Sequence, residues 1–127
     1  MPRSKKILPT DSELAILRVL WEHGPRTVRQ VNEEINRNRK TGYTTTLKLM
    51  QIMHEKGLLV RDTEVWPHVY QAQYQQEQTQ SELLGKVLDR AFSGSAEKLV
   101  MRLLGSRKVS REELDRIKKM LDEFEGE

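Results

Sequence analysis

The sequence places four polar side chains on the outward side of a helix predicted over residues 43–56, away from its apolar positions. They are Thr44, Thr45, Lys48 and Gln51. Threonine bonds base edges or packs its methyl group on thymine, lysine reaches the acceptors of guanine, and glutamine matches adenine. This face therefore predicts base reading in the major groove of DNA. Local capping by threonine and a solvated Lys–Gln surface are the simpler alternatives.

Basic residues gather around this predicted helix. Residues 26–61 contain eight Lys and Arg against three acidic residues, a local excess of +5 in a chain whose net charge is +3. Such side chains bind phosphates and fix the register of a protein on DNA without reading its sequence. Backbone N–H groups near Thr27, at a predicted helix start, are a further phosphate-binding group. An unevenly charged but merely solvated surface is the alternative.

The sequence contains no pattern typical of an enzyme. It has no cysteine, which excludes a disulfide scaffold, a thiolate metal site and a cysteine nucleophile. The three histidines, at positions 23, 54 and 68, fall on separate predicted elements, with no nucleophile or metal-ligand spacing beside them. We therefore expect no catalytic residue, no metal site and no cofactor.

Three helices must position the polar face. Apolar periodicity predicts them over residues 11–23, 27–36 and 43–56. Capping boxes that begin at Thr10 and Thr27 set the first two starts. Gly24 and Pro25 end the first helix, because glycine adopts a left-handed cap and proline cannot continue a helix. A polar, basic loop separates the second helix from the third.

A hairpin follows the third helix. Residues 58–64 form a β-like run and residues 68–74 alternate, so we expect two strands with a short tip near 63–67. Three helices and a hairpin in about 65 residues are the layout of a winged helix-turn-helix domain, whose third helix lies in the major groove. The candidate DNA-binding residues are Arg26, Thr27, Arg29, Arg39, Lys40, Tyr43, Thr44, Thr45, Lys48, Gln51 and His68.

The glutamine-rich stretch 75–80 is the best domain boundary. Residues 1–76 carry a net charge of +4 and residues 77–127 a net charge of −1. Such asymmetry indicates a basic binding module joined to a near-neutral one. Beyond the boundary, the pattern predicts a fourth helix capped by Thr79, a fifth over 95–104 and a sixth capped by Ser110. The predicted fold is mainly α with a small β-hairpin: a winged helix-turn-helix DNA-binding domain, 1–76, and a C-terminal three-helix dimerisation region, 77–127.

The fourth predicted helix is too apolar for a monomer. It has six apolar residues within ten positions, and a small domain buries only about 60% of the surface of its unfolded chain. A two-fold dimer would cover this surface and set two recognition helices about 34 Å, or a multiple of it, apart on a palindrome. A helical cap on its own winged helix is the alternative. The candidate interface residues are Leu83, Leu84, Val87, Leu88, Phe92, Leu99, Leu103, Ile117 and Leu121.

Two other kinds of protein fit the same layout. A winged helix that only binds proteins would have an apolar or acidic face on its third helix, and this face is polar and basic. A small-ligand sensor would need a site between the modules, and the sequence shows none. No apolar run approaches the roughly 18–20 residues that span a membrane, and the N-terminus lacks the core of a signal peptide. We expect a soluble, cytoplasmic protein.

Several segments resemble penicillinase repressors of the BlaI/MecI type. They are residues 20–31, residues 43–59 with Tyr-Thr-Thr at their start, His68-x-Tyr70, and residues 112–117. The resemblance covers nearly the whole chain. It implies a homodimeric transcriptional repressor on a palindromic operator of double-stranded DNA, with DNA contacts from the third helix and the wing and a dimer held by the C-terminal helices.

The resemblance also bears on induction. In the best-known members, a membrane-bound sensor metalloprotease triggers cleavage of the repressor at an Asn-Phe pair, which makes such a sensor a partner implied by resemblance only. Arg102-Leu103 stands at the matching position, and this departure argues against cleavage there. Copper-responsive relatives carry a cysteine-rich metal site, which a chain without cysteine lacks.

Overall fold

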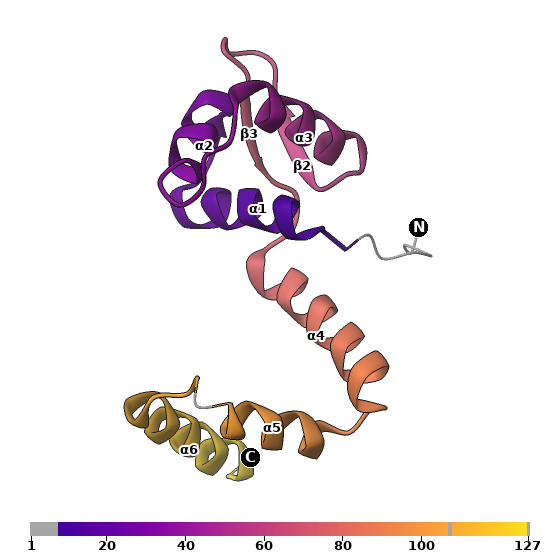
Figure 1. The fold of residues 1–127 in the computed structure, drawn as a ribbon, viewed down its shortest axis with the longest axis vertical. Coiled ribbons are helices and arrows are strands. Elements are labelled where there is room, and N and C mark those ends of the chain that lie inside the picture. Colours follow the sequence, from indigo (N-terminus) through magenta and orange to yellow (C-terminus); the bar gives the residue numbers. More distant parts are fainter. Residues whose placement is uncertain (1–7, 107, 127) are drawn as a thin grey trace. The chain divides into compact units, whose positions relative to one another are not determined.

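The protein is mainly helical with one small antiparallel sheet (Figure 1), as predicted. The computed structural model describes residues 8–106 and 108–126; the first seven residues, for which we expect no signal peptide, lie outside them. The described residues form two compact units, divided between Leu83 and Leu84. The elements are α1 (Asp11–His23), β1 (Arg26–Thr27), α2 (Val28–Ile35), α3 (Tyr43–Glu55), β2 (Leu59–Asp62), β3 (Val69–Ala72), α4 (Gln76–Phe92), α5 (Ala96–Gly105) and α6 (Arg111–Glu125).

Helix α1 has the predicted limits because both of its ends are capped. The Thr10 N–H donates to Glu13 Oε1 at 2.9 Å, and the Glu13 N–H donates to Thr10 Oγ1 at 3.2 Å. At the other end, Gly24 has a φ of 82°, and its N–H donates to the Leu20 carbonyl at 2.8 Å. A residue with a side chain would be strained at that φ, which explains why glycine ends the helix.

The core of the first unit lies between α1, α2, α3 and the sheet. Its buried apolar side chains come from every one of these elements except β1. Met50 and Met53 on α3 are fully buried, so this helix is anchored along its inner side. The core residues are Ile16, Leu17, Leu20, Val28, Val31, Met50, Met53, Leu58, Leu59 and Tyr70.

The sheet has one strand more than the sequence predicted. Its order is β1-β3-β2, and both pairings are antiparallel. Tyr70 on β3 lies opposite Arg26 of β1 and opposite Arg61 of β2. The prediction of a two-stranded hairpin was therefore incomplete, because the two residues of β1 are too few to show alternation and pair only through tertiary contact. This pairing fixes the start of α2 against the wing.

The predicted start of the fourth helix was wrong. Helix α4 begins at Gln76, so the glutamine-rich stretch is helical rather than a linker. The Thr79 N–H donates to the Gln75 carbonyl at 3.2 Å, and Thr79 is only 7% exposed, which makes it an interior helical residue and not a cap. Glutamine is a good helix former, so a polar composition by itself did not indicate a break.

A buried ion pair joins the start of α1 to the end of α3. Glu13 is 2% exposed, and its carboxylate accepts hydrogen bonds from Lys56 Nζ at 2.8 and 3.0 Å as well as from the Thr10 backbone. Lys56 is the C-cap residue of α3. A buried carboxylate without its cation is costly, so this pair constrains the position of the third helix.

Replacing Lys56 by alanine should lower the free energy of unfolding by about 3 kcal/mol, because it leaves the Glu13 carboxylate buried and unpaired. The value lies at the low end for buried pairs, since the Lys56 side chain is 33% exposed. Urea unfolding at one fixed protein concentration measures the change. Lys98→Ala, at an exposed position on α5, is the control. Equal midpoints for the two variants would contradict a stabilising role of the pair.

Candidate nucleic-acid interface

Helix α3 presents a polar face to solvent. Thr46, Met50 and Met53 are buried and define its inner side. The four polar side chains predicted to read bases, Thr44, Thr45, Lys48 and Gln51, are all exposed. Ile52 is also exposed, so the outward surface is polar with one apolar side chain. The structure thus leaves this helix free to contact a partner along the predicted face.

Asparagine side chains fix the loop that leads into α3. Asn32 Nδ2 donates to Thr46 Oγ1 at 2.8 Å and to the Thr41 carbonyl at 2.9 Å. Asn36 Nδ2 donates to the same carbonyl at 2.9 Å, and the Thr41 N–H donates back to Asn36 Oδ1 at 2.8 Å. These bonds hold the first turn of α3 against α2, while the predicted phosphate-binding residues Arg39 and Lys40 in this loop stay exposed.

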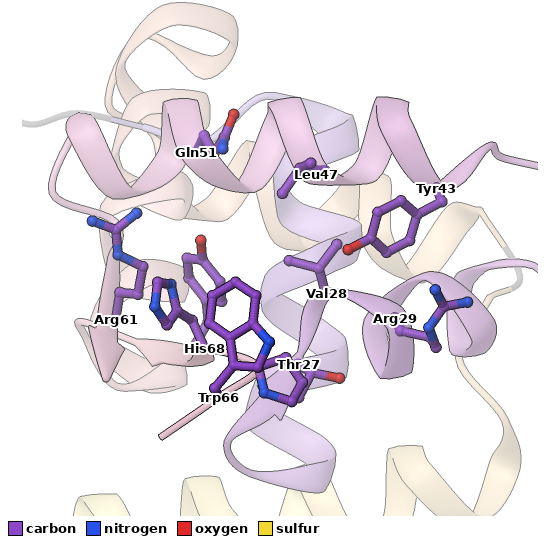
Figure 2. Close-up of a pocket in the computed structure, with 11 residues that line it drawn as sticks. Thr27, Val28, Arg29, Tyr43, Leu47, Gln51, Arg61, Trp66 and His68 are labelled. Atoms are coloured by element: carbon purple, nitrogen blue, oxygen red, sulfur yellow. The ribbon is translucent and has the colours of Figure 1, made fainter. Parts of the chain in front are cut away.

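A groove of about 550 Å³ lies between α3, the start of α2 and the wing (Figure 2). It brings together five of the eleven predicted DNA-binding residues from four separate elements or turns. They are Thr27, Arg29, Tyr43, Gln51 and His68. Val28, Leu47 and Tyr70 form apolar parts of its wall. The groove therefore combines polar, cationic and aromatic groups beside the exposed face of α3.

Arg29 and Tyr43 form one end of this groove. The guanidinium carbon of Arg29 lies 5.1 Å from the centroid of the Tyr43 ring, within the range of a cation–π contact. Both residues are exposed. The contact joins the first turn of α2 to the first turn of α3, and it orients a cation beside the polar face (Figure 2). Thr27, which caps α2 through its hydroxyl, lies two residues before Arg29 in the chain.

The wing forms the other side of the groove. The rings of Trp66 and His68 meet edge to face, with centroids 4.8 Å apart and planes at 87°. Trp66 is 83% exposed, which is unusual for so large an apolar side chain. His68 is half-buried. An aromatic side chain thus stands out from the wing beside the groove (Figure 2).

The remaining predicted residues lie elsewhere on the first unit. Arg26 is half-buried on β1, and its guanidinium donates to the Pro25 carbonyl at 2.8 Å. It borders a depression shared with His23, Glu33 and Glu34. Arg39 and Thr45 border another depression, against Ser12 and Ala15 of α1. The predicted set is therefore spread over one groove and at least two separate depressions.

Among the groove residues that the sequence did not predict, one is a cation and one is a highly exposed aromatic residue. Arg61 on β2 and Trp66 in the wing both line it, whereas the sequence pattern marked Arg61 only as one of many basic residues and Trp66 only as part of a turn. Arg61 lies opposite Tyr70 in the β2–β3 register. That register, together with the position of α3, was the missing information, because alternation alone cannot say which helix a strand faces.

The second unit leaves its apolar side chains uncovered. Within residues 84–106 and 108–126, no side chain is buried. All nine predicted interface residues are half-buried or exposed, among them Leu84 at 52% and Leu121 at 58%. Further exposed apolar residues that the prediction omitted are Val100, Met101, Leu104, Met120 and Phe124. Exposed apolar side chains in this number are typical of an interaction site.

Among residues 8–106 and 108–126, no three His, Cys, Asp or Glu side chains cluster in a way that could hold a metal ion. No helix in the same part of the chain is long and apolar enough to cross a membrane.

The regions of similarity to known proteins span both units. A sequence model of the family described as penicillinase repressor matches residues 9–123. The chain is 28% identical over 118 residues to the transcriptional regulator BlaI of Mycobacterium tuberculosis, which covers 91% of this chain and 84% of that protein. It is 22% identical over 117 residues to the penicillinase repressor of Bacillus licheniformis, which covers 92% of this chain and 91% of that protein.

Proposed function

Because the chain belongs to the penicillinase repressor family, a family of transcriptional repressors rather than enzymes, we propose that it represses transcription as a homodimer on a palindromic DNA operator. The observation that carries the proposal is the exposed polar face of α3 next to a groove with cationic and aromatic walls. Thr44, Lys48 and Gln51 have the residue types that read base edges.

Four cations of the first unit would serve as phosphate contacts. Arg29 lies at the groove, Arg39 and Lys40 extend from the loop before α3, and Arg26 lies on the strand before α2. Such contacts would set the register of α3 without reading sequence. A winged helix that binds only proteins would have an apolar or acidic surface here, and Ile52 is the single large apolar side chain exposed on the outward part of α3 beyond Tyr43.

The uncovered apolar surface of the second unit supports dimerisation. Its exposed side chains lie on α4, α5 and α6, and a second copy would cover them with the same surface. Two copies would then present two α3 helices to half-sites related by two-fold symmetry. Proteolytic induction is not part of the proposed mechanism, because Arg102-Leu103 replaces the Asn-Phe pair and lies inside α5.

The test of operator binding is a selection of genomic fragments by the purified full chain, followed by affinity measurements at several salt concentrations. We expect a preferred palindromic sequence and a steep fall in affinity, with a log–log slope of about −0.9 for each phosphate neutralised. Equal affinity for selected and random DNA would contradict sequence-specific repression. Affinity independent of salt would contradict the phosphate contacts.

Lys48→Ala should lower affinity for the selected operator by roughly 1–3 kcal/mol and relax the preference at one base position, because Lys48 lies on the exposed face of α3. Competition between single-base operator variants measures that preference. Lys86→Ala on α4, at another exposed position, is the control. A loss of affinity that is equal on every DNA sequence would make Lys48 a phosphate contact instead.

Leu84→Glu should convert dimers to monomers, because it places a carboxylate in the apolar surface of α4. Lys86→Glu adds the same group to the same helix about 150° from the centre of the apolar arc, so it should leave the dimer intact. Sedimentation velocity over a range of concentrations distinguishes the two. A Leu84→Glu protein that stays dimeric would show that the interface excludes this part of α4.

A further inference from the structure

One apolar side chain lies within the polar face of α3. Within this helix, all of whose residues the structure describes, Ile52 at 47% and Tyr43 at 41% are the only exposed large apolar side chains. At about 100° per residue, Ile52 lies about 40° from Lys48 and about 20° from Thr45 around the helix axis. Ile52 therefore belongs to the face that carries two of the predicted base-reading residues.

The turn that carries Ile52 is fixed on its inner side. Met50 and Met53, which precede and follow it in the chain, are both 0% exposed. Lys56, one turn further on, donates to the Glu13 carboxylate at 2.8 and 3.0 Å. Isoleucine in a helix has one strongly preferred χ1 rotamer, so the methyl groups of Ile52 have a defined position on the outward surface.

The major groove of DNA offers one apolar counterpart to such a side chain, which is the 5-methyl group of thymine. The other groups on the base edges there are hydrogen-bond donors and acceptors, to which isoleucine cannot bond. A protein partner fits this position less well, because it would need a wider apolar patch. The neighbours of Ile52 on this face are Lys48 and Thr45, and Tyr43 lies more than two helical turns away.

We propose that Ile52 is a specificity-determining residue that packs against the 5-methyl group of one thymine in each operator half-site. The inference rests on the proposed function, because it assumes that α3 enters the major groove. Hydrogen bonds from Lys48 and Gln51 do not detect this methyl group, so Ile52 adds a separate kind of reading. Ile52 lies about 6 Å beyond Lys48 along the helix axis. With base pairs about 3.4 Å apart, the two side chains would read positions within about two base pairs of each other.

The test compares thymine with uracil in the selected operator, because uracil lacks only the 5-methyl group. Each thymine of one half-site is replaced in turn, and competition with the unmodified operator measures the affinity of the full wild-type chain. At one position we expect uracil to weaken binding about fourfold, which is the effect of exposing one buried methyl-sized group. The same loss should occur at the symmetry-related position of the other half-site.

Variants of the chain then assign the methyl contact to one residue. Ile52→Ala should bind the thymine and uracil operators equally at that position, because the two changes remove the same contact and their effects do not add. Ile52→Val keeps a branched side chain and should discriminate about twofold; it carries the comparison if Ile52→Ala does not fold. Val60→Ala is the matched control, since Val60 on β2 is an apolar residue of the same unit with 39% exposure. This control should discriminate as the wild type does.

Three results would overturn the inference. They are the absence of any position at which the wild type distinguishes thymine from uracil, a discrimination that Ile52→Ala leaves unchanged at every position, and a loss of affinity by Ile52→Ala that is equal on every DNA sequence. These results differ from a failure of the proposed function. In that case the wild-type chain itself would bind selected and random DNA equally.

Discussion

The ion pair between Glu13 and Lys56 is the constraint on which the first unit depends. A carboxylate that is 2% exposed would be unstable without compensation, and here it receives three hydrogen bonds from two residues that are far apart in the chain. One residue, Glu13, therefore caps α1 and also binds the end of α3. Apolar packing is non-directional, whereas this pair has a defined geometry and fixes where the proposed recognition helix ends.

The N-terminal end of α3 is held by hydrogen bonds from a side chain of α2. Asn32 donates to both Thr41 and Thr46, so α2 sets the position of the first turn of α3. Strand β1 then couples α2 to the wing, because Arg26 and Thr27 pair with β3 immediately before Thr27 caps the helix. The two walls of the groove are thus connected through a strand of two residues, which explains how a small domain positions side chains from separate elements against one another.

Local signals in the sequence were enough to predict the helices of the first unit. Capping boxes at Thr10 and Thr27, and a glycine after His23, are contacts within four residues, and the structure forms them as predicted. The missed features depend on contacts between distant residues. Strand β1 exists only through pairing with β3, the interior position of Thr79 depends on burial, and Arg61 joins the groove only through the register of β2 and β3.

The two units differ in how much apolar surface they bury. The first closes its own core around Ile16, Val31 and Met50. The second has no buried side chain within residues 84–106 and 108–126, so it closes no core of its own. A structure completed by a second copy becomes more stable as concentration rises. If the second unit joins two readers, binding of one half-site raises the effective concentration of the other, and the abundance of the protein would then tune its occupancy of DNA.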